Sequence, residues 1–332
     1  MSIGILGTGT WGFCLASLLR SKGFSTTSWS RDPELVQQLA AGEEHPFLSG
    51  HKAREGMKFT TNLSEAVNNV DCIVESVTSA GLRSVFEQIK KIKPPFCAIV
   101  LTSKGIEQNS GLILPAVLEE ILGKEIHNHI ACLSGPSYAQ EVIKGLPTSV
   151  VVAAYHPDLM NFVSEMFTTP YFRIYPNEDV LGVAYGGALK NIIAIACGIA
   201  DGLSLGHSTK AAIMTRGLHE IRKLAVAKGA KPETLSGLSG MGDLCLTCSS
   251  LISRNCRFGY LLAKGLTSQE AQKEIGMVVE GLYTCVSALQ LSQALNIPMP
   301  ITEMVYKITY EEMPIQKAVQ GLMERTVKAE HL

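Results

Sequence analysis

The sequence predicts an α/β protein in which an N-terminal domain with a doubly wound parallel sheet is followed by an all-helical C-terminal domain. Three observations predict this fold. A glycine-rich loop follows the first apolar run directly, short β-branched runs then alternate with helix-like segments, and the strand signals disappear from about Val180 onward. We therefore expect two domains, at residues 1–182 and 183–332.

Apolar runs rich in β-branched residues mark the expected strands of the first half. They are Ile3–Leu6, Ser25–Ser30, Cys72–Ser76, Cys97–Thr102, Ile130–Ser134 and Ser149–Ala153. Helices are expected between them at Trp11–Ser21, Pro33–Ala40, Leu82–Lys91 and Gly111–Ile121. Continuous apolar strands that alternate with helices are typical of a parallel sheet covered on both faces.

Long helical patterns separated by glycine and proline fill the second half. They are Val183–Ala200, Lys210–Lys228, Arg257–Lys264, Ser268–Ile275, Thr284–Leu295 and Ile301–Glu311. Because ligand sites form preferentially where domains meet, we expect the active site at the junction of the two halves.

The composition narrows the class of protein. Hydrophobic residues make up 46% of the chain, charged residues 18%, and the formal net charge is −1. The basic residues are scattered, so neither nucleic acid nor an anionic membrane is an expected partner. No apolar run approaches the roughly 20 residues that span a bilayer, and the N-terminus lacks the basic region of a signal peptide.

The cysteines favour a reducing compartment. Their number, nine, is odd, and most of them lie in apolar surroundings, so we expect free thiols and a cytoplasmic protein. Cys245 and Cys248 have the spacing of half a zinc site, with Cys256 nearby. No second such pair and no paired histidines follow, so no metal is expected.

The loop after the first strand predicts a dinucleotide site. Residues 7–12 read Gly-Thr-Gly-Thr-Trp-Gly, which matches GxGxxG, and they open a helix, as in Rossmann-like domains. Such glycines allow a tight turn, close approach of a pyrophosphate and close packing of helix on sheet. The helix N-terminus adds amide donors for the phosphates.

The end of the second strand bears on the choice of dinucleotide. An acidic residue there would bind an NAD ribose, but this chain has Arg31, and Asp32 is expected to cap the next helix. An arginine in that place can pair with a 2′-phosphate, although a surface arginine at a turn would look the same. NADP(H) is therefore favoured, and NAD(H) stays open.

Lys190 is the candidate acid/base. It is the only charged residue between Asp179 and Asp201, in a segment that reads as a helix buried nearly all round. Desolvation lowers the pKa of a lysine, which makes it a usable proton donor and acceptor near neutral pH. The simpler alternative is a lysine whose ammonium group reaches water from the edge of the helix.

Polar residues at two strand ends are candidates for the substrate site. Lys104 follows the strand at 97–102, and Gly135 and Ser137 follow the strand at 130–134. Ligands of doubly wound sheets bind beyond the carboxyl ends of the strands, where these residues are expected. The Ser137 hydroxyl is equally suited to capping a helix.

The second half contributes a carboxylate and a polar triplet. Residues 237–243 read as a flexible glycine-rich loop that ends in Asp243, which is suited either to hold Lys190 charged or to cap a helix. Ser253, Arg254 and Asn255 follow an apolar pair, and Arg254 is the natural partner of a phosphate or carboxylate. A surface turn would look much the same. Glu280 is a further polar residue at the edge of an apolar segment.

Together these motifs resemble the bacterial NAD(P)-dependent glycerol-3-phosphate dehydrogenases over nearly the whole chain, from Ile3 to about Arg325. The motifs that carry the resemblance are the GxGxWG loop, the Lys190 segment GALKNIIAIACG, Thr209-Lys210-Ala211-Ala212, Thr215-Arg216-Gly217, the loop GLSGMGDLCLTC, and Ser253-Arg254-Asn255 with Arg257-Phe258-Gly259. The resemblance implies interconversion of dihydroxyacetone phosphate and sn-glycerol 3-phosphate, normally as a reduction that supplies phospholipid backbones. It leaves a homodimer open.

The resemblance also implies roles for single residues. Lys190 would be the general acid/base. The substrate would contact Lys104, Gly135, Ser137, Lys190, Asp243, Ser253, Arg254 and Asn255. The cofactor would contact Gly7, Gly9, Thr10, Trp11, Gly12, Arg31, Lys104, Ala139, Arg254, Val278 and Glu280.

Two departures from the family stand out. Thr78 replaces the proline of a usual Val-Pro-Ser, which leaves the loop beneath the cofactor less constrained. His207 stands where an acidic or amide-bearing loop is commoner; a local acid/base is one interpretation, and a loop variant is the one we favour.

Two other functions stay open from the residues themselves. Related two-domain reductases of small 2-keto or 3-hydroxy acids share the architecture and a helix lysine, but they must hold a carboxylate in place of a phosphate. A non-catalytic dinucleotide sensor would need only the nucleotide site and would have no use for Lys104, Lys190, Asp243 and Arg254 together.

Overall fold

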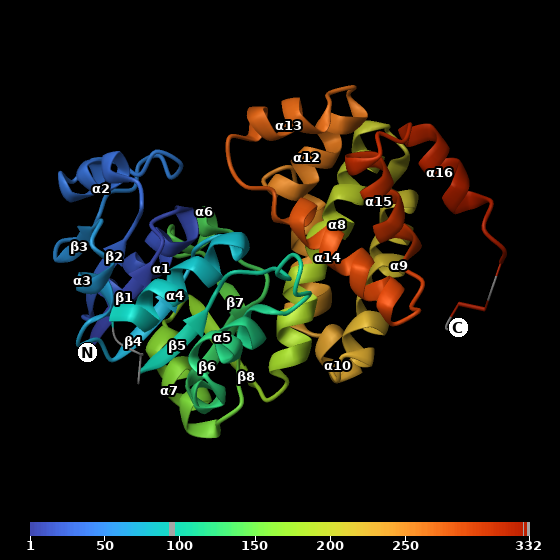
Figure 1. The fold of residues 1–332 in the computed structure, drawn as a ribbon. Helices are drawn as coiled ribbons and strands as arrows, with labels where there is room; N and C mark the ends of the chain where they lie inside the picture. Colours follow the sequence, from blue (N-terminus) through green and yellow to red (C-terminus); the bar gives the residue numbers. More distant parts are fainter. Residues whose placement is uncertain (93–96, 328, 331–332) are drawn as a thin grey trace.

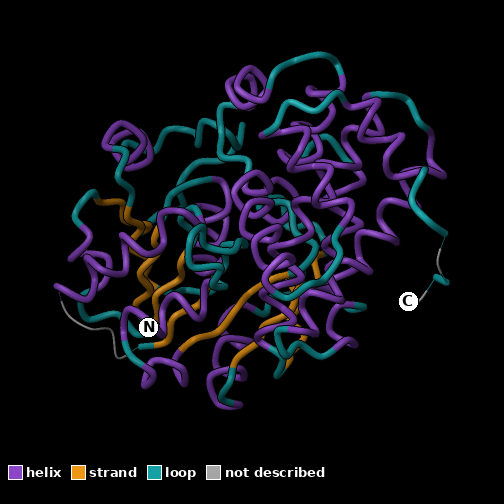
Figure 2. Tube along the Cα trace, turned by 45° about the vertical axis from the view of Figure 1, so that its right-hand side comes forward, coloured by secondary structure: helices purple, strands orange, loops and turns teal. Residues whose placement is uncertain are grey.

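The computed structural model describes residues 1–92, 97–327 and 329–330. In the described residues, one sheet of eight strands forms the N-terminal part, and helices alone form the remainder (Figures 1 and 2). The strands lie in the order β3-β2-β1-β4-β5-β6-β7-β8. Their bounds are β1 Ser2–Leu6, β2 Ser25–Trp29, β3 Met57–Thr60, β4 Cys72–Glu75, β5 Ala98–Leu101, β6 Ile130–Ser134, β7 Thr148–Ala154 and β8 Phe172–Asn177.

The sheet is mostly, but not wholly, parallel. Strands β1 to β6 pair in parallel, whereas β7 runs antiparallel to β6 and carries β8 parallel to itself. The predicted doubly wound parallel sheet is confirmed, and of the described strand pairs only β6–β7 departs from it. An apolar run does not record the direction of its strand, and an antiparallel pair needs no full crossover helix. Only the four-residue helix α6 (Ala139–Val142) lies between β6 and β7.

The two strands that the sequence did not predict, β3 and β8, are the two edges of the sheet. Strand β3 reads Met-Lys-Phe-Thr and is only half-buried, and β8 contains Pro176. Edge strands face solvent and tolerate proline, so they lack the continuous apolar run of a central strand.

Helices cover both faces of the sheet. Apolar residues of α1 and α7 pack on one face, and those of α4 and α5 pack on the other. The bounds are α1 Thr10–Ser21, α2 Pro33–Ala40, α3 Leu63–Val67, α4 Leu82–Ile92, α5 Leu114–Leu122 and α7 Pro157–Phe167, with short turns of 3₁₀-helix at Ser79–Gly81 (η1) and Lys124–His129 (η2).

The helical part is built around α8, which runs from Val180 to Gly202 and is buried along most of its length. The other bounds are α9 Gly206–Ala227, α10 Pro232–Leu235, η3 Leu238–Gly242, α11 Asp243–Ser249, α12 Arg254–Ala263, α13 Ser268–Ile275, α14 Glu280–Ala294, α15 Pro300–Tyr310 and α16 Ile315–Met323. Strand β8 ends at Asn177 and α8 begins at Val180, so a division at 182/183 would fall within the first turn of α8. That division stays a prediction.

Helix α8 is a core helix, although it is long and apolar enough to cross a membrane by length and composition. Of its most apolar 18-residue window, 83% is buried within the protein. The expectation that no apolar stretch reaches this length was wrong, because Asp179 caps the helix further upstream than the periodicity indicated. The other helices of this part surround it (Figure 1).

Two glycines bring α12 against α8. A Cβ on Gly198 would lie 1.9 Å from the carbonyl oxygen of Cys256, and one on Gly259 would lie 2.0 Å from that of Ile195. Only glycine permits so close an approach of the two backbones. The first turn of α12, which carries Arg254, is thereby fixed beside the middle of α8.

Candidate active site

The glycine-rich loop has the shape that a dinucleotide phosphate requires. Gly7 has φ +105° and lies against the Ser76 carbonyl, and a Cβ on Gly12 would lie 2.1 Å from the carbonyl oxygen of Gly7. Gly9, the N-cap of α1, is exposed, and a Cβ there would meet nothing within 4 Å. No side chain of the described residues caps α1, so its first amides can donate to an anion. The residues present therefore fit a nicotinamide dinucleotide.

Arg31 lies exposed at the end of β2, beside this loop. Its guanidinium lies 3.7 Å from the place of a Cβ on Gly81. Asp32 caps α2 by accepting from the amides of Glu34 and Leu35 at 3.1 Å, as predicted. Asp32 is thus occupied in the helix cap, whereas the side chain of Arg31 is exposed.

Lys190 and Lys104 meet on one carboxylate. Asp243 accepts from Lys190 Nζ through Oδ1 and from Lys104 Nζ through Oδ2, each at 2.5 Å. Lys190 comes from α8, Lys104 from the loop after β5, and Asp243 from the first turn of α11, so the sheet and the helical part both contribute. Gly187, one turn before Lys190, leaves room for the Lys104 stem, which lies 3.4 Å from the place of its Cβ.

Burial and charge act in opposite directions in this cluster. Burial lowers the pKa of Lys190 to about 8; Asp243 opposes that shift, and the second ammonium group, on Lys104, adds to it. Burial by itself raises the pKa of Asp243, but the two ammonium groups outweigh it and hold this pKa below its usual range. At neutral pH the site therefore holds a carboxylate and a protonated lysine that gives up its proton readily.

Thr247 is a member of this cluster that the sequence did not predict. Its Oγ1 accepts from Lys190 Nζ at 2.6 Å and donates to the main-chain carbonyl of Asp243, also at 2.6 Å. The signal was the spacing of four residues from Asp243, which places both side chains on one face of a helix. The sequence predicts a flexible loop before Asp243, yet this segment is a helical turn that leads into α11.

The strand-end residues of β6 face the same cluster. Lys104 Nζ donates to the Gly135 carbonyl at 3.3 Å, and the Ser137 hydroxyl donates to that carbonyl at 3.2 Å. Ser137 does not cap α6, whose N-cap is Tyr138 without a side-chain bond. Ala139 begins α6, and its carbonyl accepts from the thiol of Cys14 on α1.

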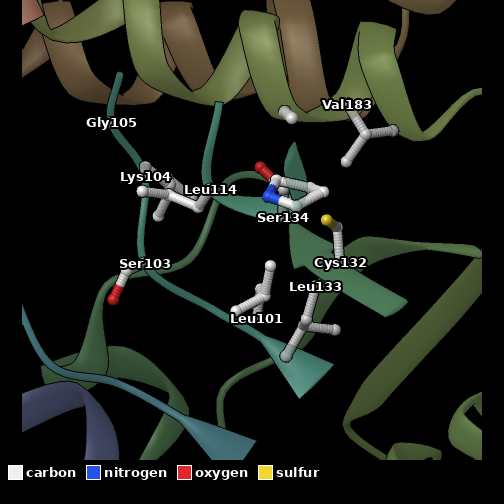
Figure 3. A pocket seen from close by; sticks show the side chains of 11 residues that line it. Leu101, Ser103, Lys104, Gly105, Leu114, Cys132, Leu133, Ser134 and Val183 are labelled. Carbon is white, nitrogen blue, oxygen red and sulfur yellow. The ribbon is translucent and has the colours of Figure 1, made fainter. Parts of the chain in front are cut away.

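A small cavity lies behind Lys104, between the strand ends and α8 (Figure 3). Its lining is mostly apolar and includes Leu101, Cys132 and Val183, the last reaching down from α8. The hydroxyl of Ser134, also in the lining, is buried without a hydrogen-bond partner among the described residues.

The three residues Ser253, Arg254 and Asn255, at the start of α12, have different roles. Ser253 caps α12 by accepting from the amide of Cys256. Asn255 is buried and joins α8 to α14, donating to Asn191 Oδ1 at 3.0 Å and accepting from the Gly281 amide at 2.9 Å. Arg254 is exposed and donates to the Val278 carbonyl at 3.0 Å, so its guanidinium keeps most of its donors for a ligand.

Glu280 connects the helical part to the loop after β4. It accepts from the Ser79 hydroxyl and, at 3.2 Å, from the Ser79 amide. Burial raises the pKa of Glu280, against the effect of these bonds and of Arg254. Thr78, in the same loop, has φ −66°, the value that a proline would impose.

Comparison with known proteins identifies the family. The N-terminal model of NAD-dependent glycerol-3-phosphate dehydrogenase matches residues 2–160, and the C-terminal model matches residues 179–320. The glycerol-3-phosphate dehydrogenase (NAD(P)+) of Protochlamydia amoebophila is 62% identical over 330 residues, 99% of this chain and of that one. The chain belongs to the NAD-dependent glycerol-3-phosphate dehydrogenase family.

Solved structures agree with this family. The crystal structure of glycerol-3-phosphate dehydrogenase from Coxiella burnetii has a TM-score of 0.93 at 38% identity and covers 98% of this chain and 99% of its own. A ketopantoate reductase from Ralstonia eutropha has a TM-score of 0.59 at 14% identity over 98% of this chain and 100% of its own. The second likeness shows a shared fold alone, so the fold by itself does not separate the two reactions.

Other residues singled out by the sequence lie outside the cluster. His207 is exposed in the first turn of α9. Cys245, Cys248 and Cys256 are free thiols, as are the other six cysteines. Among the described residues, no group of three or more His, Cys, Asp or Glu side chains is placed to hold a metal ion.

Proposed function

We propose that this chain interconverts dihydroxyacetone phosphate and sn-glycerol 3-phosphate with NADP(H) or NAD(H), in the reducing direction to supply backbones for glycerophospholipids. The observation that carries the proposal is the pairing of Lys190 and Lys104 on Asp243, where the loop after β5 meets helices α8 and α11. Reduction of the carbonyl needs one proton at the carbonyl oxygen, and binding of the phosphate needs a cation. This junction supplies both.

In the proposed mechanism the protein orients the reactants and moves one proton. When bound, the cofactor supplies the hydride to C2 of the substrate. Lys190 donates its proton to the C2 oxygen, and its lowered pKa assists this donation. Asp243 and Thr247 hold the Lys190 ammonium in place through its other hydrogen atoms. In the oxidation direction the neutral amine of Lys190 takes the proton back.

The remaining site residues bind and orient. Arg254 pairs with the substrate phosphate, and the free amides of α1 with the exposed Gly9 hold the cofactor pyrophosphate. Arg31 meets a 2′-phosphate where the cofactor carries one. Lys104 lies where cofactor and substrate meet. The contacts for each ligand are those that the family resemblance implies.

The test is a substrate panel with NADPH and with NADH. We expect cofactor oxidation with dihydroxyacetone phosphate and almost none with unphosphorylated dihydroxyacetone or with 2-keto acids, measured at 340 nm, roughly the absorbance maximum of a reduced nicotinamide. Activity confined to a 2-keto acid would replace this proposal with the alternative reductase. Cofactor binding without any turnover would favour the sensor.

Removing the Arg254 guanidinium is expected to weaken substrate binding. Arg254→Ala should raise the KM for dihydroxyacetone phosphate by about 10- to 100-fold, the effect of a lost charge-assisted hydrogen bond pair. Lys264→Ala, which removes a cation from the far end of the same helix, is the matched control and should leave KM unchanged. An unaltered KM in Arg254→Ala would contradict the role.

Two further expectations belong to this proposal. The nine free thiols support a cytoplasmic location, where thiols stay reduced. A homodimer stays a prediction, and light scattering of the purified chain measures it directly.

A further inference from the structure

A buried carboxyl group outside the cluster is left unexplained by the proposed chemistry. Glu75 is the last residue of β4, at the carboxyl ends of the strands, where the ligands are expected. Its exposed fraction is 0%. The neighbouring Ser76 packs on Gly7 and Gly12 of the nucleotide loop. A buried acid in such a place costs free energy unless its hydrogen bonds repay it.

The hydrogen bonds of Glu75 join two loops. Its Oε1 accepts from the Val77 amide at 2.8 Å, in the loop after β4. In the loop after β5, its Oε1 lies 2.7 Å from the Ser103 hydroxyl, and its Oε2 accepts from the Ser103 amide at 3.3 Å. Ser103 directly precedes Lys104. Glu75 therefore fastens the loop that carries Lys104 to the loop beneath the cofactor.

The protons shared by Glu75, Ser103 and the Val77 carbonyl bear on the charge of the Glu75 carboxyl group. The Ser103 hydroxyl is within hydrogen-bond reach of both Glu75 Oε1 and the Val77 carbonyl oxygen. Three oxygen atoms in a row need two protons between them, and a serine hydroxyl brings one. With Ser103 donating to the Val77 carbonyl, a protonated carboxyl group would supply the other by donating to Ser103 Oγ.

Charge considerations agree with a neutral acid. Of the described titratable groups around Glu75, Cys132 on β6 is buried and uncharged, with a pKa of about 12, and the Lys104 ammonium is held by Asp243. No cation therefore compensates a carboxylate at Glu75 within the described residues. A carboxylate there would also lie beside the loop that receives phosphates. Burial raises the pKa of Glu75 to about 7.

We propose that Glu75 is a positioning residue that acts as a neutral carboxylic acid, linking the Val77–Ser79 loop to Ser103 and so fixing Lys104 for substrate. The proposal rests on the proposed function in one respect, the role of Lys104. Gly105 supports the same contact, because a Cβ there would lie 2.5 Å from that of Ser79. Glu75 thus supplies to this loop the constraint that the absent proline at Thr78 does not.

Two substitutions separate the neutral acid from a merely structural group. Glu75→Gln is uncharged and keeps one donor and one acceptor, but an amide nitrogen in the place of Oε1 cannot also accept from Val77. At pH of about 6.5 its KM for dihydroxyacetone phosphate should therefore rise by less than that of Glu75→Leu. Glu75→Leu fills the space with neither donor nor acceptor, and should raise that KM about tenfold with a smaller effect on kcat. Above pH of about 7, KM should rise in wild type and not in Glu75→Gln.

Glu220 provides the matched control. It is also a buried carboxyl group with a pKa raised by burial to about 7, but it accepts from the Ile301 and Thr302 amides and the Thr302 hydroxyl at the start of α15. Every partner there is a donor. Glu220→Leu should lower the melting temperature without changing KM for substrate.

An infrared measurement reads the proton directly and does not depend on activity. Buried protonated carboxylic acids each contribute a carbonyl-stretch band at pH of about 6, and Glu220 is expected to contribute one beside Glu75. One such band should be lost in Glu75→Gln and retained in Glu220→Gln. If Glu75→Gln removes no such band, the proposal that Glu75 is a neutral acid is overturned. An unchanged KM in Glu75→Leu, a Glu220→Leu that shifts KM equally, or identical KM profiles against pH in wild type and Glu75→Gln would overturn the positioning role. A wild type inactive on dihydroxyacetone phosphate would count against the proposed function, and the infrared result would still stand.

Discussion

Replacing Lys190 with alanine is expected to lower kcat for reduction of dihydroxyacetone phosphate by at least about 100-fold, the usual loss for a general acid. The Lys190 ammonium donates to Asp243 and Thr247 at the centre of the predicted site, and alanine can donate no proton there. NADPH binding, measured by quenching of protein fluorescence, should be almost unchanged, because the nucleotide loop lies on the other part of the chain.

Lys190→Arg distinguishes proton transfer from charge. Arginine keeps the positive charge but does not release a proton in this pH range, so its kcat should fall as far as that of Lys190→Ala. Circular dichroism verifies that both variants are folded. Activity within about threefold of wild type in Lys190→Ala would refute the acid/base role.

Replacing Asp243 with asparagine is expected to harm both stability and activity. Asp243 is 1% exposed and carries both ion pairs, so its loss leaves the buried ammonium group of Lys190 and the partly buried one of Lys104 facing each other without a counter-charge. Breaking such a pair from one side costs about 3–5 kcal/mol of unfolding free energy, which urea titration measures.

The same substitution should remove the acid from catalysis. Without Asp243, burial and the charge of Lys104 both push the pKa of Lys190 below its present value of about 8, so less of it is protonated at neutral pH. The kcat for reduction should therefore fall by at least about tenfold. Glu303→Gln, which breaks the partly exposed Glu303–Lys307 pair of α15, is the control and should cost at most about 0.5 kcal/mol without changing kcat. Equal effects of the two substitutions would contradict the arrangement.

Much of the fold followed from local sequence patterns. The buried central strands and the long helices are each long enough, and apolar enough, to be read from their own residues. The direction of β7 was not predictable, because hydrophobic periodicity is the same in either direction. The edge strands β3 and β8 were missed, since half-exposed strands carry a weak apolar signal.

Part of the candidate site was likewise predictable from local sequence, and part was not. Lys190 stood out as a single charge in an apolar helix, and Lys104 and Asp243 each followed an identifiable strand or glycine run. Their meeting on one carboxylate is a matter of tertiary packing that no local pattern encodes. Gly240 contributed to the wrong prediction of a flexible loop, because this glycine is needed for close packing. A Cβ there would lie 2.1 Å from the Leu235 carbonyl oxygen. A glycine required for close contact looks, in sequence, like one required for flexibility.

The pH dependence of kcat for dihydroxyacetone phosphate reduction, with saturating NADPH, tests the proposed mechanism most directly. Protonated Lys190 is the donor, and its pKa is about 8. We therefore expect kcat to be level below that pH and to fall as the pH rises through it, because the acid is then lost. The opposite dependence is expected for glycerol 3-phosphate oxidation, which needs the neutral amine. A kcat for reduction that stays level, or rises, from pH of about 7 to about 10 would contradict Lys190 as the proton donor.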